Sequence, residues 1–395
     1  MNSIDSRIFI REAKDEGYLY VCKITCKDDC EGYFGVSAIG SDAVNIKPNI
    51  KKASYLRPFL YNVISNKELI MKKLLLIVIT IGIWSCAEDT AIKPDYVLSA
   101  EQKHNKFSSA IPPVLRVSTG SVIKVDTHEA SDGQLHREAN IDDLKNIDFG
   151  PIHPLTGPVY VEEAEIGDIL AVDLLDIELH DYGWQAIVPG FGFLSDRFPD
   201  ARLTIYKINT VAGTATFNDK VELKLNPFPG VMGVAPETAE MLSTIPPRAN
   251  GGNMDDPNLT EGTTVYFPVF VKGALFSIGD THAIQGLGEV CGTAIETPMT
   301  ITYRLRVLKD KPAIKEPQYE NDEIYAVTGF GETIDIATKK AVNYMIDHLV
   351  DNYDITAEDA YMLCSLVGDL KIAEVVDVPN MLVTMHFPKR ILRQL

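Results

Sequence analysis

A glycine-rich polar segment enclosed by two apolar, strand-like runs constrains this chain more than any other feature. The segment covers residues 273–298, with the apolar run 265–275 at its start and the run 299–307 after it. Rigid strands that feed a glycine-rich loop commonly hold a metal site or an acid–base site. Within seventeen residues the segment carries carboxylates, an imidazole and an amide: Asp280, His282, Gln285, Glu289 and Glu296.

The rest of the body also favours short β-strands. Apolar, β-branched runs occur at 159–161, 169–175, 203–208, 265–271 and 299–307, separated by Gly, Pro and Asp. Many short strands at close spacing are typical of a sandwich or barrel-like core. The sequence therefore predicts a β-sandwich or barrel-like body.

The C-terminal part changes character. Apolar residues recur at helical spacing over 336–350, which predicts an amphipathic helix. A second helix is expected to begin after Thr356 as its cap and to end at Gly368. Strand-like runs follow at 370–378 and 382–387. We therefore expect a β-rich α+β fold, with a C-terminal α+β unit packed on the β body.

Charge separates the first 86 residues from the rest. They contain 12 Lys and Arg against 9 Asp and Glu, and the remaining residues contain 25 against 46. Because a body this acidic repels phosphate backbones, we expect no nucleic-acid partner. It suits a neutral or cationic small substrate, although acidic surfaces mostly serve solubility.

A segment that begins at Met71 indicates export. Lys72 and Lys73 precede ten apolar residues, 74–83, and then Ile83-Trp-Ser-Cys86. Ten helical residues rise only about 15 Å, too short to span a bilayer. The pattern is typical of a bacterial secretory signal whose Cys86 would be lipid-modified, although Trp84 departs from the usual small residue. The alternative is a buried apolar strand.

These observations predict four parts of the chain. Residues 1–70 would be an upstream, non-native extension, and residues 71–86 a lipoprotein-type signal peptide. Residues 87–100 would be a tether and residues 101–395 the functional domain. The mature protein is expected in the bacterial cell envelope, periplasmic or at the cell surface, and attached to the membrane through its lipid alone.

The glycine-rich segment offers ligands for a divalent metal. Asp280 and His282 supply donor types that suit zinc, and an extended Thr281 would direct both to one side. Glu289 is expected to handle protons or to serve as a further ligand, with Gln285 beside it in the catalytic group. Glu296 is either a third ligand or a buried carboxylate bonded to backbone amides.

Further candidates lie outside that segment. Asn253 and Asp255 follow a Gly-Gly pair and would hold an amide group or a ligand, or simply build a turn. Glu129 and Gln134 belong to a second acidic cluster, which would complete the site or cap a loop. We expect a catalytic role for Glu129 and a substrate contact for Gln134. Cys291 suggests thiol-dependent hydrolysis, but no Lys or Arg lies between residues 272 and 304 to support it.

Several segments, in order, resemble the acetamidase/formamidase family over roughly residues 100–390. The resemblance rests on these residues: His104-Asn-Lys-Phe107, Ile111-Pro-Pro113, Gly157-Pro-Val-Tyr-Val-Glu162, Gly167-Asp168, Pro227-Phe-Pro-Gly-Val-Met-Gly-Val-Ala-Pro-Glu237, Ile245-Pro-Pro-Arg248, Gly251-Gly-Asn-Met-Asp255, the glycine-rich segment, Ala360-Tyr-Met-Leu-Cys-Ser365, Gly368-Asp-Leu370 and Val375-Val-Asp-Val-Pro-Asn380.

The resemblance implies a metal-dependent amidohydrolase, with zinc as the expected metal, that converts small linear amides to a carboxylate and ammonia. It also implies a β-rich body and a homodimer. One residue departs from the pattern, because Leu287 stands where the family has an aspartate. If that aspartate is a metal ligand, the substitution would weaken metal binding or activity, and if it only supports a ligand, the effect would be smaller. The alternatives are therefore a non-catalytic binding lipoprotein that keeps the fold, and a lactam hydrolase.

Overall fold

The computed structural model describes four strands within residues 5–49 and the continuous chain 92–395. The chain divides into two units, Met1–Ala91 and Ile92–Leu395. In the first, β1 (Asp5–Glu12), β2 (Tyr18–Thr25), β3 (Glu31–Ile39) and β4 (Ala43–Asn49) form an antiparallel sheet in chain order. The predicted signal segment and its Cys86 lie outside the described residues.

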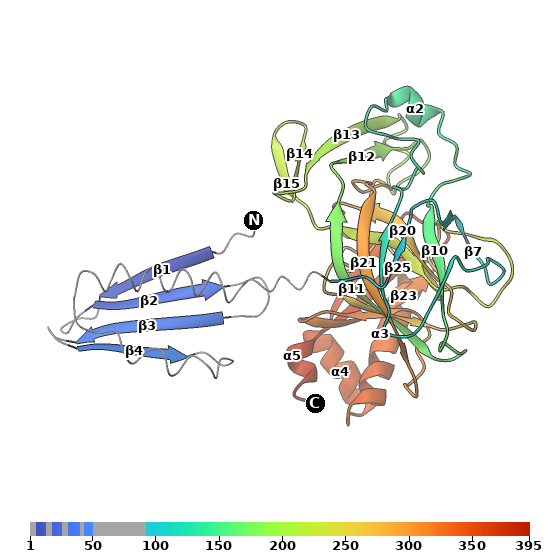
Figure 1. The fold of residues 1–395 in the computed structure, drawn as a ribbon. Helices are drawn as coiled ribbons and strands as arrows, with labels where there is room; N and C mark the ends of the chain where they lie inside the picture. Colours follow the sequence, from blue (N-terminus) through green and yellow to red (C-terminus); the bar gives the residue numbers. More distant parts are fainter. Residues whose placement is uncertain (1–4, 13–17, 26–30, 40–42, 50–91) are drawn as a thin grey trace. The chain divides into compact units, whose positions relative to one another are not determined.

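The second unit is built on a nine-stranded sheet (Figure 1). Its strand order is β24-β25-β23-β22-β19-β11-β21-β9-β5. The bounds are β5 (Tyr96–Leu98), β9 (Val122–Asp126), β11 (Ile169–Leu179), β19 (Thr264–Pro268), β21 (Met299–Leu308), β22 (Gln318–Glu320), β23 (Ile324–Gly331), β24 (Asp369–Glu374) and β25 (Met381–Pro388).

A six-stranded sheet carries the strands that matter for the site. Its order is β18-β16-β20-β10-β6, and β8 pairs with β10. The bounds are β6 (Lys103–His104), β8 (Leu115–Val117), β10 (Leu155–Val161), β16 (Phe228–Gly233), β18 (Gly251–Asn253) and β20 (Phe276–His282). A small pair joins β7 (Lys106–Phe107) to β17 (Leu242–Ser243).

One hydrophobic core joins the two large sheets. Leu170 and Val172 of β11 and Phe267 of β19 belong to it from the nine-stranded sheet, and Phe276 and Ile278 of β20 from the six-stranded sheet. Strands present alternate residues to one face, so a shared core of this kind is that of two sheets packed face to face. The predicted β-rich, sandwich-like body is confirmed.

Helices cover part of the nine-stranded sheet (Figure 1). They are α3 (Ile334–Asn352), α4 (Ala357–Val367) and α5 (Lys389–Leu392); a further short helix is α2 (Ile141–Lys145). Ala337, Ala341 and Met345 of α3 pack with Val383 and Met385 of β25 in a second core. The predicted helical spacing is confirmed, and so are the cap at Thr356 and the end at Gly368.

The strands of the predicted C-terminal unit, β24 and β25, continue the nine-stranded sheet of the body through β23. Two other expectations need correction. The apolar run 265–275 is not one strand: β19 ends at Pro268, and Ala274 and Leu275 adopt positive φ angles of 58° and 59° before β20 begins. Residues 96–98 are no free tether, since β5 pairs in parallel with β9 and buries Leu98.

A peripheral four-stranded sheet completes the unit. It contains β12 (Tyr182–Ile187), β13 (Arg202–Asn209), β14 (Thr214–Phe217) and β15 (Val221–Lys224) in that order. Bridges from Glu296 to both Trp184 of β12 and His282 of β20 connect this sheet to the six-stranded one. Within the described part of the chain, the helices are too short or too polar to cross a membrane.

Candidate active site

Six buried side chains converge at the end of β20, and we call them the acidic cluster. Among the described residues, three overlapping groups have possible ligand atoms within 4.8 Å of one another. The groups are Asp255 with Asp280 and His282; His282 with Glu289 and Glu296; and Asp255 with Glu289 and Asp377. Each of the six side chains is less than a tenth exposed.

Strand β20 places the two predicted ligands. Asp280 and His282 stand two residues apart at its end, as expected for side chains that share a face. His282 Nε2 lies 3.5 Å from Asp280 Oδ1 and 3.1 Å from Glu296 Oε2. Glu296 reaches the same point because its backbone bridges to that of His282.

Strand β16 forms the floor of the cluster, and it needs a glycine there. A Cβ at Gly230 would collide with Asp255 Oδ1, and it would lie 2.7 Å from His282 Cε1 and 2.9 Å from the Asp280 carbonyl. The Gly230 carbonyl accepts hydrogen bonds from the backbone N–H groups of Met254 and Asp255. Gly230 therefore both makes room for Asp255 and fixes the backbone that carries it.

The loop after β20 carries Glu289 and is tied to the C-terminal strands. The Gly288 N–H donates to the Ala373 carbonyl at 2.7 Å, and Gly288 bridges to Glu374 of β24. Beyond β24 the chain turns, with the N–H groups of Val376 and Asp377 both donating to Glu374 Oε2 at 2.9 Å. This turn brings Asp377 to Glu289.

Backbone strain gathers at the cluster. Asp255, Asp280 and Glu289 have φ angles of 42°, 47° and 44°, and the neighbouring His153 has 52°. Residues other than glycine rarely adopt such angles, and each costs on the order of 1–3 kcal/mol. Strain of this kind persists where the surrounding structure holds side chains in place for a function.

Gln285 fixes the orientation of the imidazole. Its Nε2 donates to the Asp255 carbonyl at 2.6 Å, so its Oε1 faces His282 Nδ1 at 2.8 Å and accepts from it. With the proton on Nδ1, the lone pair of His282 Nε2 points toward Asp280 and Glu296. Gln285 thus directs the other imidazole nitrogen toward these two carboxylates.

Burial and mutual repulsion shift the pKa values of the cluster. Burial, and next the charge of Asp255, raise the pKa of Glu289 well above its usual range. Burial also raises the pKa of Asp255, to about 8. Burial lowers the pKa of His282, but Glu296 and Asp280 outweigh it and the net pKa is well above the usual value. Without a cation the cluster therefore holds protons that a metal would displace.

Unpartnered buried atoms show that the cluster fits a metal. Asp255 Oδ1, Asp280 Oδ1 and Glu296 Oε2 are buried without a hydrogen-bond partner. Buried carboxylate oxygens normally find donors or coordinate metals. One imidazole nitrogen among several carboxylate oxygens is a donor set that zinc accepts. Asp280, His282 and Glu296 are the residues that would hold it.

Two predicted site residues are not brought to the cluster. The carboxylate of Glu129 accepts hydrogen bonds from the Ser131 N–H and hydroxyl, from the Gly133 N–H and from Trp184 Nε1. Gln134 bonds to backbone groups of Ser131 and Asp148. Apart from the bond with Trp184, both side chains make their hydrogen bonds within residues 129–148, as the loop-capping alternative predicted.

The predicted residue Asn253 lies beside the cluster and contacts Asp377. Asp377 itself was missed by the sequence reasoning. Asn253 Nδ2 donates to Asp377 Oδ2 at 2.6 Å. Asp377 stood within Val375-Val-Asp-Val-Pro-Asn380, one of the resembling segments, but its contact with Glu289 depends on the turn after β24. A carboxylate inside the apolar run 370–378, three residues beyond the end of β24, was the available signal.

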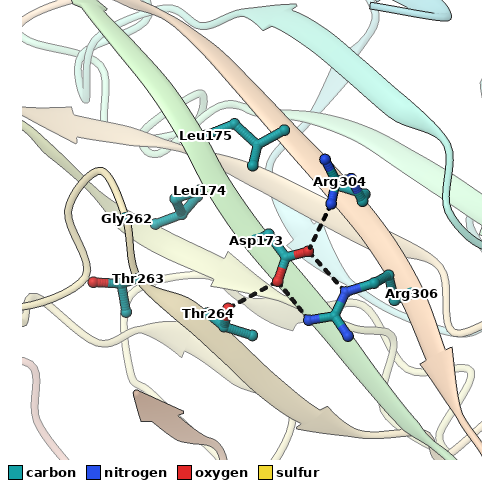
Figure 2. A pocket seen from close by; sticks show the side chains of 8 residues that line it. All are labelled: Asp173, Leu174, Leu175, Gly262, Thr263, Thr264, Arg304 and Arg306. Carbon is teal, nitrogen blue, oxygen red and sulfur yellow. Dashed lines mark hydrogen bonds and ion pairs between the residues drawn. The ribbon is translucent and has the colours of Figure 1, made fainter. Parts of the chain in front are cut away.

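A hollow elsewhere on the body does not resemble an active site. It measures about 500 Å³ and lies on β11 and β21, with no residue of the acidic cluster in its lining (Figure 2). Asp173 at its centre binds Arg306 through two hydrogen bonds, at 2.8 and 2.6 Å, and accepts another from Thr264. The acidic group of this hollow is thus already paired.

Comparisons with known proteins agree on one family. The model of the Acetamidase/Formamidase family matches residues 92–243 and 237–394. A formamidase from Methylophilus methylotrophus is 28% identical over 365 residues, which cover 73% of this chain and 89% of the relative. An acetamidase from Mycolicibacterium smegmatis is 31% identical over 268 residues, covering 52% of this chain and 66% of the relative.

A solved structure shows the same architecture. It is a predicted acetamidase/formamidase from Thermoanaerobacter tengcongensis, with a TM-score of 0.72 and 33% identity. The match covers 76% of this chain and 97% of that one. The residues that the family model matches contain the acidic cluster and the strands that carry it. They make up more than half of the sequence. This chain therefore belongs to the acetamidase/formamidase family.

Proposed function

We propose that this protein is a metal-dependent amidohydrolase that cleaves the C–N bond of small linear amides such as formamide and acetamide. Family membership supports hydrolysis of amides, releasing a carboxylate and ammonia. The observation that supports metal dependence is the set of unpartnered buried oxygens around His282.

Amide hydrolysis requires a polarised carbonyl, an activated water and a proton for the leaving amine. A divalent metal held by Asp280, His282 and Glu296 would polarise the carbonyl and lower the pKa of water. Gln285 would keep His282 Nε2 directed at the metal through its bond to Nδ1.

Glu289 is the residue we assign to proton transfer. Its pKa is raised well above the usual range by burial and by Asp255, which suits a carboxyl that exchanges protons. It lies within the same group of close ligand atoms as His282 and Glu296. In its ionised form, the carboxylate would take a proton from water and then give that proton to the departing amine.

The test measures ammonia release from formamide and acetamide by the full chain. We expect activity that is lost on chelation and restored by zinc. Asp280→Asn should lower kcat/KM by more than about 100-fold, because it removes a ligand rather than a supporting residue. Asp173→Asn, which changes the paired aspartate of the surface hollow, is the matched control and should stay active. Activity that survives complete metal removal would refute metal dependence.

The binding-only alternative predicts a different result. That alternative was motivated by Leu287, whose side chain is 42% exposed, whereas Glu289 is 7% exposed. The substitution therefore leaves all six side chains of the acidic cluster in place. Stoichiometric metal without turnover of either amide would support the binding protein.

The lipid anchor at Cys86 and the homodimer remain predictions. The intact mass of the native protein tests the first, since a lipidated chain that begins at Cys86 is expected. A mass that begins at Met1 would refute the signal segment.

A further inference from the structure

The acidic cluster is open to solvent on the side of one of its members, Glu289. That side chain is 7% exposed, and Gln285 on the same loop is 9% exposed. The five other side chains of the cluster are at most 2% exposed: Asp255, Asp280, His282, Glu296 and Asp377. A substrate that reaches the buried part of the cluster therefore has to enter past Glu289.

Three apolar side chains lie on the segments that meet at this opening, and we call them the apolar rim. Val290 directly follows Glu289, and Val378 directly follows Asp377, whose carboxylate lies close to that of Glu289. The N–H of the third, Phe193, donates to the Val290 carbonyl at 3.0 Å. Each of the three side chains is more than half exposed. Three separate segments thus present an apolar residue beside the most accessible carboxyl of the cluster.

The loop that carries Phe193 is fixed against the loop that carries Val290. A Cβ at Gly192 would lie 2.6 Å from the Cys291 carbonyl oxygen, and a Cβ at Gly292 would lie 2.5 Å from Phe191 Cδ1. Both glycines are therefore needed for the two backbones to approach so closely. Together with the hydrogen bond from Phe193, these contacts make the apolar rim a preformed surface.

The position of the apolar rim indicates a contact with substrate. Single exposed apolar residues are common on proteins and need no explanation. Apolar residues grouped at the mouth of a buried polar site are typical of ligand sites, in which the polar groups orient the ligand and the apolar groups contact its remainder. The carboxamide of a substrate would lie among the buried carboxylates. Its acyl substituent would then point back toward the opening.

We propose that the apolar rim binds the acyl chain of the substrate, so that the enzyme prefers amides with an apolar chain longer than that of acetamide. This inference rests on the proposed function, because it assigns the substrate class of the same site. A fully buried methylene strengthens binding about fourfold, and an open rim would cover about half of each methylene. We therefore expect a gain of about twofold for each methylene added.

The test measures ammonia release by the zinc-loaded full chain from formamide, acetamide, butyramide and hexanamide. From acetamide to hexanamide, kcat/KM should rise by about 16-fold, which is about twofold for each of four methylenes. The rise should appear mainly as a lower KM, because the rim contacts the chain equally in the ground state and the transition state. A kcat/KM that stays level or falls along the series would overturn the proposal.

Two rim variants and one control locate the effect. Val290→Ser and Phe193→Ser should each reduce the ratio of kcat/KM for hexanamide to that for acetamide by about fourfold, the contribution of two methylenes. Val211→Ser changes an equally apolar and exposed residue between β13 and β14, and it should keep the wild-type ratio. If a second copy of the chain covered the rim instead, the rim variants would change the mass measured by analytical ultracentrifugation and keep the wild-type ratio. That result would also overturn the proposal.

Binding measured without turnover separates this inference from the proposed function. Saturation-transfer NMR should show that the protein contacts the alkyl end of hexanamide, and that Val290→Ser weakens this contact. Hexanamide bound in this way without release of ammonia from any amide would sink the proposed function alone. Hydrolysis of formamide and acetamide with no preference for hexanamide would sink this inference alone. Neither binding nor hydrolysis would overturn both.

Discussion

Two buried acidic regions of this molecule differ in what surrounds their carboxylates. Each oxygen of Glu129 accepts two hydrogen bonds. Three of the four donors belong to its own loop, and the fourth is Trp184 Nε1, which donates to Oε2. In the acidic cluster, one oxygen each of Asp255, Asp280 and Glu296 makes no hydrogen bond and has only the His282 imidazole within ion-pair distance. Both regions are almost fully buried, so burial does not distinguish them. Their hydrogen bonds do distinguish them, because a structural carboxylate is satisfied by the protein, whereas a proposed metal ligand keeps an oxygen without a hydrogen bond.

Among substitutions of residues other than the proposed metal ligands, the largest expected effect comes from filling the floor of the cluster. Gly230→Ala would place a Cβ against Asp255 Oδ1 and the Asp280 carbonyl, so ligands would shift. We expect kcat/KM for formamide to fall by about 100-fold, which is typical of a displacement near 1 Å in an active site. Zinc affinity, measured by competition with a chelator, should weaken as well.

Gly286→Ala is the matched control for that variant. Gly286 lies on the loop after β20, and a Cβ there would meet nothing within 4 Å. Its activity and zinc affinity should match the wild type. Equal losses in both variants would mean that the glycines matter for loop flexibility, and the steric explanation of Gly230 would be wrong.

Glu129→Gln should lower stability and leave the chemistry intact. The amide has one acceptor oxygen where the carboxylate has two, so donors such as the Gly133 N–H or Trp184 Nε1 lose their acceptor. Each buried group left unpaired costs about 1–3 kcal/mol, which gives a loss of about 2–4 kcal/mol in the free energy of unfolding. Urea denaturation measures it, and kcat/KM should keep its wild-type value.

Glu296→Gln should have the opposite effects, because it should preserve the stability of the metal-free protein and alter the chemistry. Glu296 Oε2 is buried without a hydrogen-bond partner, and Oε1 accepts from the Ala294 N–H. A glutamine that keeps its oxygen on that N–H leaves no backbone donor without an acceptor, so the neutral side chain should not lower the stability of the metal-free protein. Zinc binding should weaken instead. A large loss of metal-free stability would show that Glu296 is a structural carboxylate like Glu129.

Local patterns in the sequence were sufficient for much of the fold and part of the site. Helical spacing located α3, and Thr356 and Gly368 marked the ends of α4, because caps and periodicity are local properties. Asp280, His282, Glu289 and Glu296 could be grouped since they lie on one strand and the loop that follows it.

The rest depended on contacts between distant segments. Asp377 reaches Glu289 only through the turn after β24 and the bond from Gly288 to Ala373. Glu129 and Gln134 had the right residue types, but their hydrogen bonds are decided by Trp184 and by the loop backbone. Residue type and spacing do not reveal whether a buried carboxylate already has its donors.

The smallest expected effect concerns Leu287, the position at which the resemblance led us to expect an aspartate. The side chain is 42% exposed, although its neighbour Gly288 is anchored to β24. Leu287→Asp should therefore leave zinc affinity and kcat/KM within about threefold of wild type, as usual for surface changes that alter stability by no more than about 0.5 kcal/mol. A tenfold gain in either quantity would contradict this and make position 287 part of the site. The cluster would then be incomplete in this chain, whereas the hydrogen bonds around Glu129 are complete.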